Sequence, residues 1–417
     1  MAVEQQQIYL NAYQREARNA LQRFINGECA DTFLLQALEH IRTYLQIPRR
    51  STTPLLADSD IARLAQAIQT HLFDRGFWRQ LLALWPPLIT LAEQLPEPII
   101  YAELVKQLAM IKDRQGDGEA THLLYTKLLT SPQFPKLPIA LQADVLQQRG
   151  TTLVWQGELT TARSLLDQVL SLVQQHPIDQ APRSHADQYG VRSNLEVTPL
   201  WESKAYALNQ LGNIAMFQGR FKQAERLYIA CWQTINKQGE AENLACVAHQ
   251  ALGRLWLHWG RVEQAMPILE KGIAIRRRRQ DRAGVAINLI YLAAALLQER
   301  QLDQAEALLT EALPITRSID NRRDTGLCHL YFGQLDLLCH RHSDALAQWQ
   351  QALTYFQTVH TPLIEQRVFI FYSPWLLLIG ERAMLRTVTN QLFKSLRQQG
   401  LTTTDWIRLF IRLNTKF

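Results

Sequence analysis

The sequence predicts an all-α protein, a superhelical solenoid of stacked antiparallel helix hairpins. Glycine and proline are scarce, with 18 and 16 among 417 residues, whereas a strand-rich fold needs turn residues at intervals of roughly eight to twelve positions. Hydrophobic residues make up 47% of the chain, which is ordinary for a globular protein and excludes bulk disorder. An alanine also recurs at intervals close to 40 residues, and such internal repetition is typical of repeat arrays.

Five columns of residues keep this register over five units. The alanine column comprises Ala162, Ala224, Ala265, Ala305 and Ala345, with spacings of 41, 40 and 40 after an insertion of about 22 residues. A small residue lies twelve positions earlier, at Gly150, Gly212, Gly253, Ala293 and Gly333. A turn or polar residue lies five positions earlier, at Gly157, Gly219, Gly260, Arg300 and His340. A large apolar residue lies four positions later, at Leu166, Tyr228, Leu269, Leu309 and Trp349, and a mostly small one three further on, at Val169, Cys231, Gly272, Ala312 and Ala352.

These columns indicate a helix hairpin in each unit. The first helix is expected to end near Gly219, where glycine readily takes the left-handed conformation of a helix terminus. The second helix then begins within two or three residues. Gly212 and Ala224 are expected to face each other because a close helix crossing needs small side chains, with Leu211 and Tyr228 filling the flanking holes. One hairpin cannot bury its apolar face alone, so successive copies stack into a superhelix.

The pattern resembles the tetratricopeptide repeat, with its small eighth residue, turn near the fifteenth and alanine at the twentieth. The resemblance covers residues 140–360 clearly, and weaker copies near Gly76, Gly116 and Gly380 extend it. The longer period is similar to that of the 40-residue variety found in bacterial signalling ATPases, kinesin light chains and peptide-sensing regulators. It implies a right-handed superhelix of about eight hairpins in which the first helix of each pair lines the concave face.

The chain divides into segments around this array. Residues 1–47 hold two amphipathic stretches, 4–25 and 32–46, and are a helical cap or a degenerate repeat. The further divisions are a loop at 48–60, repeats at 61–175, an insertion loop at 176–199, well-matched repeats at 200–360, and a degenerate repeat with a capping helix at 361–417. Within them, 131–138 is expected to be a loop, the apolar run 368–372 a buried helix, and Pro86-Pro87 a kink or break.

The sequence points to the cytoplasm. Its N-terminus has neither the basic nor the apolar region of a secretory signal, and no run reaches the roughly 18 apolar residues of a membrane span. The five cysteines are odd in number and form no C-x-x-C pair, so buried reduced thiols are expected rather than disulfides or a zinc site.

No spacing of residues predicts catalysis. The phosphate-loop, dinucleotide-binding, nucleophile-elbow and zinc-protease patterns are all absent from the sequence. His340 and His342 stand two apart at an expected turn and match no usual ligand spacing. We therefore expect the protein to have no enzymatic activity and to bind no metal ion or cofactor.

A binding groove is the expected functional site. Polar residues recur on the first helices of two successive units, where the tetratricopeptide resemblance places the concave face: Tyr206, Asn209, Asn213, Gln250, Arg254 and His258. Asparagine donates and accepts hydrogen bonds together, which suits an extended peptide backbone. Asn213 matches the ninth position, which holds peptides in binding members of the family. Arg254 takes that position in the next unit and could pair with an acidic side chain or a C-terminal carboxylate. The alternative is that these are solvated residues on amphipathic helices.

Four consecutive arginines, Arg276, Arg277, Arg278 and Arg279, are the sharpest charge feature. They belong to residues 250–300, which contain nine Lys or Arg and four Asp or Glu. Residues 382–417 contain seven Lys or Arg and one Asp or Glu. Because the whole chain has a net charge of only +6, the rest of the sequence is acidic on balance. Such basic regions could steer an acidic protein or nucleic acid. A solvated helix end is the favoured interpretation, because cations are favourable there and no aromatic residues interleave the run.

The functional prediction is a non-enzymatic adaptor that binds a peptide or protein segment, acidic or not, in the concave groove. One alternative is a regulatory receptor that senses a small peptide. The other is a nucleic-acid-associated scaffold that uses the basic regions. Salt dependence of binding distinguishes the last from the others, because phosphate contacts make affinity fall steeply with salt.

Overall fold

The computed structural model describes residues 2–47, 56–176, 199–237 and 241–359. In this part of the chain all regular structure is helical, with sixteen α-helices and one short 3-10 helix. The α-helices are α1 (Ala2–Ile25), α2 (Asp31–Leu45), α3 (Leu56–Asp74), α4 (Trp78–Ala92), α5 (Pro98–Gln115), α6 (Gly118–Thr130), α7 (Ile139–Gln156), α8 (Leu159–Gln175), α9 (Leu200–Phe217), α10 (Phe221–Asn236), α11 (Ala241–His258), α12 (Val262–Arg278), α13 (Arg282–Gln298), α14 (Leu302–Ser318), α15 (Arg322–Leu338) and α16 (His342–Thr358).

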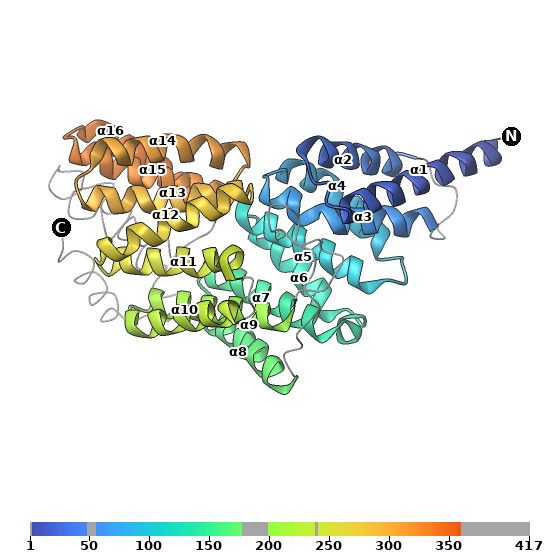
Figure 1. Ribbon diagram of the computed structural model, residues 1–417, viewed down its shortest axis with the longest axis horizontal. Helices are drawn as coiled ribbons and strands as arrows, with labels where there is room; N and C mark the ends of the chain where they lie inside the picture. The colour runs from blue at the N-terminus through green and yellow to red at the C-terminus, as the bar shows by residue number, and fades with distance from the viewer. Residues whose placement is uncertain (1, 48–55, 177–198, 238–240, 360–417) are drawn as a thin grey trace.

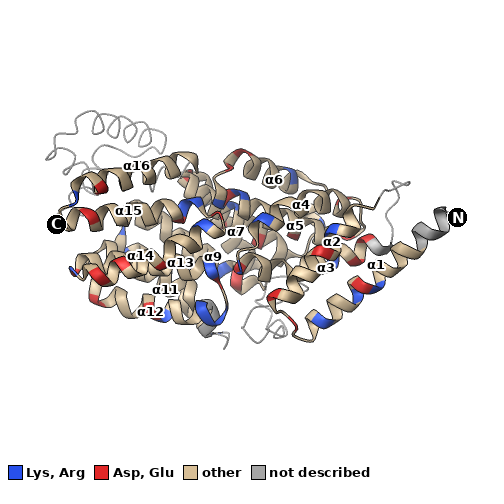
Figure 2. Ribbon diagram, turned by 90° about the horizontal axis from the view of Figure 1, so that it is seen from above, with Lys and Arg blue, Asp and Glu red and all other residues tan. Residues whose placement is uncertain are grey.

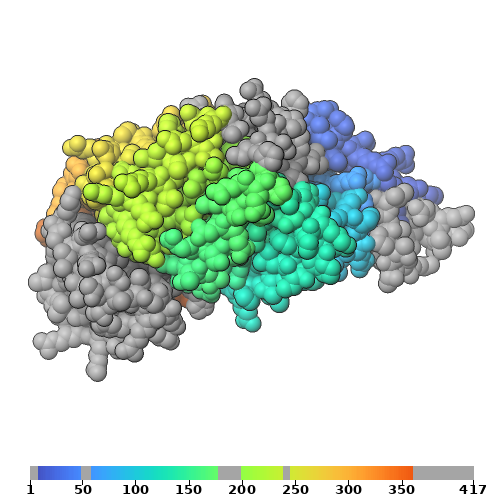
Figure 3. Space-filling view, turned by 90° about the horizontal axis from the view of Figure 1, so that it is seen from below, coloured from blue at the N-terminus to red at the C-terminus, as the bar shows by residue number. Residues whose placement is uncertain are grey.

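The helices form a superhelical array of hairpins (Figure 1). Each odd-numbered helix from α3 to α15 packs against the next helix in the chain, and odd-numbered helices also pack on one another in succession, as an inner layer. The even-numbered helices form the outer layer, and seen from below the chain follows its own order across the surface, from blue to orange (Figure 3). The predicted fold class, an all-α right-handed solenoid of stacked antiparallel hairpins, is confirmed.

The predicted turn column is found between the helices of each hairpin. Its five members all have positive φ: 85° at Gly157, 71° at Gly219, 71° at Gly260, 61° at Arg300 and 60° at His340. This left-handed conformation ends one helix and lets the next begin two residues later. Three units use glycine for it, and two force a residue with a side chain into the same backbone geometry.

The small-residue column packs differently from the prediction. Gly212 lies against the ring of Tyr228, not against Ala224: a Cβ atom at Gly212 would penetrate that ring. In the other units a Cβ at Gly150 would come within 2.9 Å of Leu166, and one at Gly253 within 2.7 Å of Leu269. Each glycine therefore leaves the space that the large apolar side chain of the second helix fills, because interiors are close-packed and that side chain needs more room than the neighbouring alanine.

The last described hairpins return to the first ones. The inner helices α13 and α15 contact α3 and α5 respectively, and these segments lie beside each other in Figure 1. Ile319, at the end of α14, is buried in the N-terminal hydrophobic cluster, where it covers Gly76. Gln115 donates a hydrogen bond of 2.7 Å to Asp320. The inner helices of the last described hairpins are therefore in contact with those of the first ones.

Several local predictions have clear outcomes. The amphipathic stretches at 4–25 and 32–46 correspond to α1 and α2. The expected loop at 48–60 is shorter, because α3 begins at Leu56; the expected loop at 131–138 contains the 3-10 helix, Phe134–Lys136. The helix does not break at Pro86-Pro87: α4 continues through both. The insertion at 177–198, the run at 368–372 and the rest of 361–417 lie outside the described residues.

The five cysteines are free, and all but Cys339 are buried. This agrees with the expectation of buried thiols, and it extends to Cys29, which follows a loop glycine rather than an apolar run. None of the helices that the structure describes is long and apolar enough to cross a bilayer.

Candidate functional site

Asn213 of α9 is the centre of a buried hydrogen-bond network rather than a free groove residue. Its side-chain nitrogen donates to Gln210 at 2.6 Å, and its oxygen accepts from the hydroxyl of Tyr228 at 2.7 Å and from the guanidinium of Arg254. Asn213 is 2% exposed and Arg254 4%. The alternative that these are solvated residues on an amphipathic helix is therefore wrong for both.

Arg254 of α11 lies between aromatic rings of two other inner helices, α7 and α13. Its guanidinium carbon is 5.5 Å from the ring centre of Trp155 on α7 and 6.0 Å from that of Tyr291 on α13. Its Nη2 atom is 3.5 Å from the hydroxyl of Tyr228, and its Nε atom has no hydrogen-bond partner. Cation–π contacts of this kind are favourable but do not neutralise the charge.

Trp155 also contacts a second guanidinium from the far end of the array. The guanidinium carbon of Arg323, on α15, is 5.0 Å from the ring centre of Trp155. Arg323 is itself buried and pairs with Asp113 of α5 across 3.1 Å. The half-buried Trp155 therefore brings together three inner helices that are not neighbours in the stack, namely α7, α11 and α15.

Asn209 lies one turn before Asn213 on the same face of α9. It is buried, with 7% of its surface exposed, and its side-chain oxygen has no hydrogen-bond partner. Leaving a buried amide oxygen without a hydrogen-bond donor costs free energy. A bound group that donates a hydrogen bond to this oxygen would remove that cost. The first-helix face chosen from the sequence thus holds both a satisfied asparagine and an unsatisfied one.

Tyr206 and Gln250 belong to a second cluster, which includes the arginine run. Gln250 accepts a hydrogen bond of 2.8 Å from Arg276, whose other nitrogen pairs with Asp281. Burial and Glu202 raise the pKa of the Tyr206 phenol, whereas Arg279 and Arg276 lower it. The structure therefore divides the predicted groove residues: Asn213 and Arg254 lie together, and Tyr206 and Gln250 lie near the end of α12.

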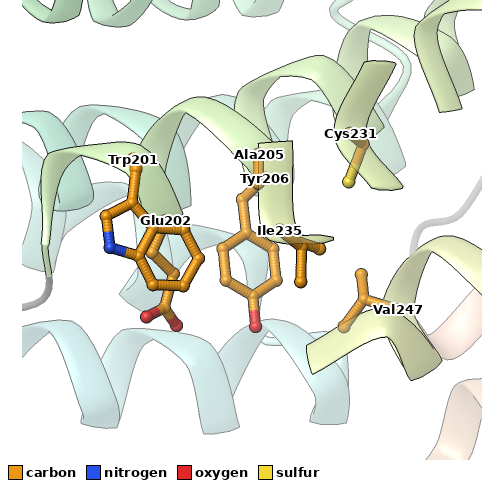
Figure 4. A pocket seen from close by; sticks show the side chains of 7 residues that line it. All are labelled: Trp201, Glu202, Ala205, Tyr206, Cys231, Ile235 and Val247. Carbon is orange, nitrogen blue, oxygen red and sulfur yellow. The ribbon is translucent and has the colours of Figure 1, made fainter. Parts of the chain in front are cut away.

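Tyr206 lines a small apolar pocket between α9, α10 and α11 (Figure 4). Its other lining residues are Trp201, Glu202, Ala205, Cys231, Ile235 and Val247. Burial raises the pKa of the Cys231 thiol to about 12, so this sulfur is a packing group rather than a nucleophile.

The arginine run is not a free basic patch, so this prediction is wrong for most of its members. Arg276 is buried and paired with Asp281, Arg279 lies 3.7 Å from Asp74 of α3, and Arg277 forms an exposed pair of 2.6 Å with Glu311. Blue and red segments are interspersed along the helices of the ribbon rather than gathered in separate regions (Figure 2). The run faces carboxylates brought by neighbouring helices, which one-dimensional counting of charge does not reveal.

The remaining histidine positions form no evident site. His258 is half-buried at the end of α11. The rings of His340 and His342 are 6.4 Å apart and perpendicular. Within the described ranges, no group of three or more His, Cys, Asp or Glu side chains is arranged to hold a metal ion.

A family model described as the tetratricopeptide repeat matches residues 205–237, which run from within α9 to the end of α10. The hairpin formed by α9 and α10 is therefore a tetratricopeptide-type repeat. The hairpins stacked on it share its helix-turn-helix form, so the array has a tetratricopeptide-like fold. No curated protein matches the chain.

Solved structures share the fold of this chain over nearly its whole length. A Rap protein complexed with Competence and Sporulation Factor is 10% identical, covers 95% of this chain and 99% of its own, and superposes with a TM-score of 0.59. The Rap conjugation gene regulator of the plasmid pLS20, in complex with the Phr* peptide, is 10% identical, covers 98% of each chain, and gives 0.52. At this identity the likeness shows the fold alone.

Three interior residues were not predicted from the sequence as site residues: Trp155, Arg323 and Asp113. Nothing local in the sequence marks any of the three as a site residue. Their pairing depends on closure of the superhelix, which no single repeat encodes. The sequence offered only a weak signal for these site residues. Charged residues occur on the inner helices, where a purely structural repeat would have apolar ones.

Proposed function

We propose that this chain is a non-enzymatic scaffold that holds a peptide or protein segment against the inner helices of its superhelix. The observation that carries the proposal is the polar inner wall of α9 and α11. There Asn209 presents a buried oxygen without a donor, and Arg254 presents an unpartnered Nε. An extended peptide supplies backbone N–H and C=O groups that match such side chains.

The structural neighbours support a peptide as the partner. The Rap protein was solved with Competence and Sporulation Factor and the pLS20 regulator with the Phr* peptide, and both match this chain over at least 95% of its length. A finer proposal follows, that the chain is a regulatory receptor which senses a small peptide in the cytoplasm.

The nucleic-acid alternative gains no support from the arginine run. Three of the four arginines pair with carboxylates of neighbouring helices. Binding of nucleic acid stays a prediction from the sequence. Measuring the affinity for nucleic acid at rising salt concentration tests it, because phosphate contacts would make the affinity fall steeply.

Native mass spectrometry of the full chain with randomised short peptides tests the proposal. We expect a subset of peptides to be retained, and Asn209→Ala to reduce their retention because it removes an unsatisfied inner oxygen. Asn213→Ala is a poorer probe, since it also removes the buried oxygen that accepts hydrogen bonds from both Arg254 and Tyr228.

Gln168→Ala is the matched control for Asn209→Ala. Gln168 is an exposed residue of the outer helix α8, so its loss should leave peptide retention unchanged. If no peptide is retained, or if the two variants behave alike, the inner wall does not bind short peptides and the proposal fails.

A further inference from the structure

Two contacts between the first and the last described hairpins have the same form. Ile319, directly after α14, covers Gly76 in the turn between α3 and α4, so that a Cβ atom at Gly76 would overlap the isoleucine side chain. Val359, directly after α16, covers Gly116 in the turn between α5 and α6, where a Cβ atom would overlap the backbone of the valine. Both pairs are 243 positions apart, from 76 to 319 and from 116 to 359. The contact therefore repeats with the register of the array, and we call it the seam.

The residue types at the seam fit this contact. Arg300 and His340 hold the same turn position as the two glycines, with φ of 61° and 60°, so a residue with a side chain can take this turn. Glycine at the seam also leaves room for the opposite residue. That opposite residue directly follows an outer helix, and after the outer helices α4 to α12 the same position is polar or charged, namely Glu93, Ser131, His176, Lys237 and Arg279. Among these described helices, an apolar residue follows only the two that meet the glycines.

The seam has little apolar contact compared with the stack. Of the residues after α12 that the structure describes, only Ile319 is buried in the N-terminal hydrophobic cluster, and only the partly buried Ala283 packs against it. Successive hairpins instead share continuous apolar clusters, such as the one from Leu257 to Phe356. Three polar pairs join the two sides of the seam: Asp113 with Arg323 at 3.1 Å, Gln115 with Asp320 at 2.7 Å, and Asp74 with Arg279 at 3.7 Å. An interface of this kind separates more easily than a packed apolar core.

We propose that the seam is a latch: α14 to α16 separate from α3 to α5 while the hairpins on both sides stay folded. Opening withdraws Arg323 from Trp155, whose ring centre lies 5.0 Å from that guanidinium and 5.5 Å from the guanidinium of Arg254. The latch therefore changes the surroundings of the inner wall to which the proposed function assigns a peptide. Opening needs no ligand, so it is measured on the free protein, and its failure would leave the proposed function untouched.

Thiol labelling of the full chain measures the opening. Ile319 is 1% exposed, so Ile319→Cys places a thiol in the seam that a maleimide reaches only when the latch opens. The native Cys328 of α15 is 0% exposed within the stack and is the reference in the same molecule. We expect the seam thiol to be labelled at least about tenfold faster than Cys328, because opening the seam costs less free energy than unfolding the stack. Peptide mapping by mass spectrometry after graded labelling times gives both rates.

Leu309→Cys is the matched control, because Ile319→Cys itself removes an apolar side chain from the seam. Leu309 belongs to the same outer helix, α14, and is 0% exposed, but it packs within the stack. Its thiol should be labelled as slowly as Cys328. Val359→Cys is a second reporter of the seam, since Val359 is 4% exposed and covers Gly116; it gives the same comparison if Ile319→Cys does not fold.

Asp113→Asn, added to either reporter, weakens the latch by removing the charge partner of Arg323. It should speed labelling of the seam thiol at least about tenfold and leave Cys328 unchanged. Glu311→Gln is its control, because the exposed pair of Glu311 with Arg277 lies away from the seam, and labelling should stay as it was. Two results overturn the latch: seam thiols labelled no faster than Cys328, or an Asp113→Asn variant that speeds both equally, since the seam would then separate only on unfolding.

Discussion

Asp113 and Arg323 are 210 positions apart and form a buried ion pair. Nη2 of Arg323 donates to the carboxylate of Asp113 at 3.1 Å, and 4% of the Arg323 side chain is exposed. The pair joins α5 to α15, the inner helices that meet where the array closes. Closure therefore depends on a polar contact between repeats that are distant in sequence, in addition to the apolar contact of Ile319 with the N-terminal cluster.

Arg323→Met should destabilise the protein by about 3–5 kcal/mol, because it leaves the buried Asp113 carboxylate without its partner. Urea unfolding measures this loss. The double variant Asp113→Leu with Arg323→Met should recover most of the stability, since no unpaired charge is then left at the junction.

Arg277→Met is the control for the closing pair. Arg277 forms an ion pair of similar length with Glu311, but both side chains are exposed, so its loss should cost no more than about 1 kcal/mol. Equal losses in Arg277→Met and Arg323→Met would show that the junction contributes no more than a surface contact.

Gly212→Ala should destabilise the protein by about 1–3 kcal/mol, because the added methyl group overlaps the ring of Tyr228. A thermal or urea unfolding curve measures the effect. Helix propensity alone would favour alanine over glycine, so the sign of the change tests the packing directly.

The repeat that contains Ala293 shows which second substitution should relieve the overlap in Gly212→Ala. It combines alanine with Leu309 at the same two positions, and both are fully buried. Gly212→Ala together with Tyr228→Leu should therefore be less unstable than Gly212→Ala with Tyr228 retained. A double variant no more stable than the single one would mean that the ring is not the obstacle.

The sequence predicted what is local to one repeat and failed where repeats combine. Gly219 and His340 could be placed at turns because a left-handed residue is needed after each first helix, whatever surrounds it. Gly212 was paired with the wrong residue, since spacing shows which side chains share a hairpin but not which one enters the gap. The contact of Asp113 with Arg323 depends on the small rotation between successive repeats, which accumulates over the whole array.

The same limit applies to the candidate site. Asn213 and Arg254 lie on first helices as predicted, but an open groove would have left them solvated. Neighbouring side chains bury them instead, among them Gln210, Tyr228 and Tyr291, and Arg254 has neutral hydrogen-bond partners rather than a carboxylate. Arg276 shows the converse, since a run that looks free in the sequence meets Asp281 and Gln250 in the structure.

Arg300→Gly should stabilise the protein by up to about 1 kcal/mol. Arg300 is exposed and has a φ of 61°, a conformation that costs residues with a Cβ atom roughly that amount. The melting temperature measures the gain. Glu299→Gly is the control, because Glu299 has a φ of −83° and glycine there should bring no stabilisation; similar gains in both variants would contradict the role of the turn.

His329 should make stability fall in mildly acidic solution. Its Nδ1 atom lies 2.7 Å from the oxygen of Gln348 and its Nε2 atom 3.2 Å from the guanidinium of Arg317, an arrangement that fits a neutral ring with the proton on Nδ1. Burial and Arg317 lower the pKa of His329, and the hydrogen bond to Gln348 opposes them only in part. The folded protein therefore binds this proton less readily than the unfolded chain does.

Stability linked to His329 is complete above the ordinary histidine pKa of about 6.5, and it is lost as pH falls from there toward the lowered folded value. His329→Gln removes the titrating group, so the difference in unfolding free energy between wild type and variant should shrink as the solution is acidified through that window. Urea unfolding of both proteins at a series of pH values measures it. A difference that does not vary with pH would mean that His329 accepts a proton in the folded state as easily as in the unfolded chain, and would contradict the neutral ring bonded to Arg317.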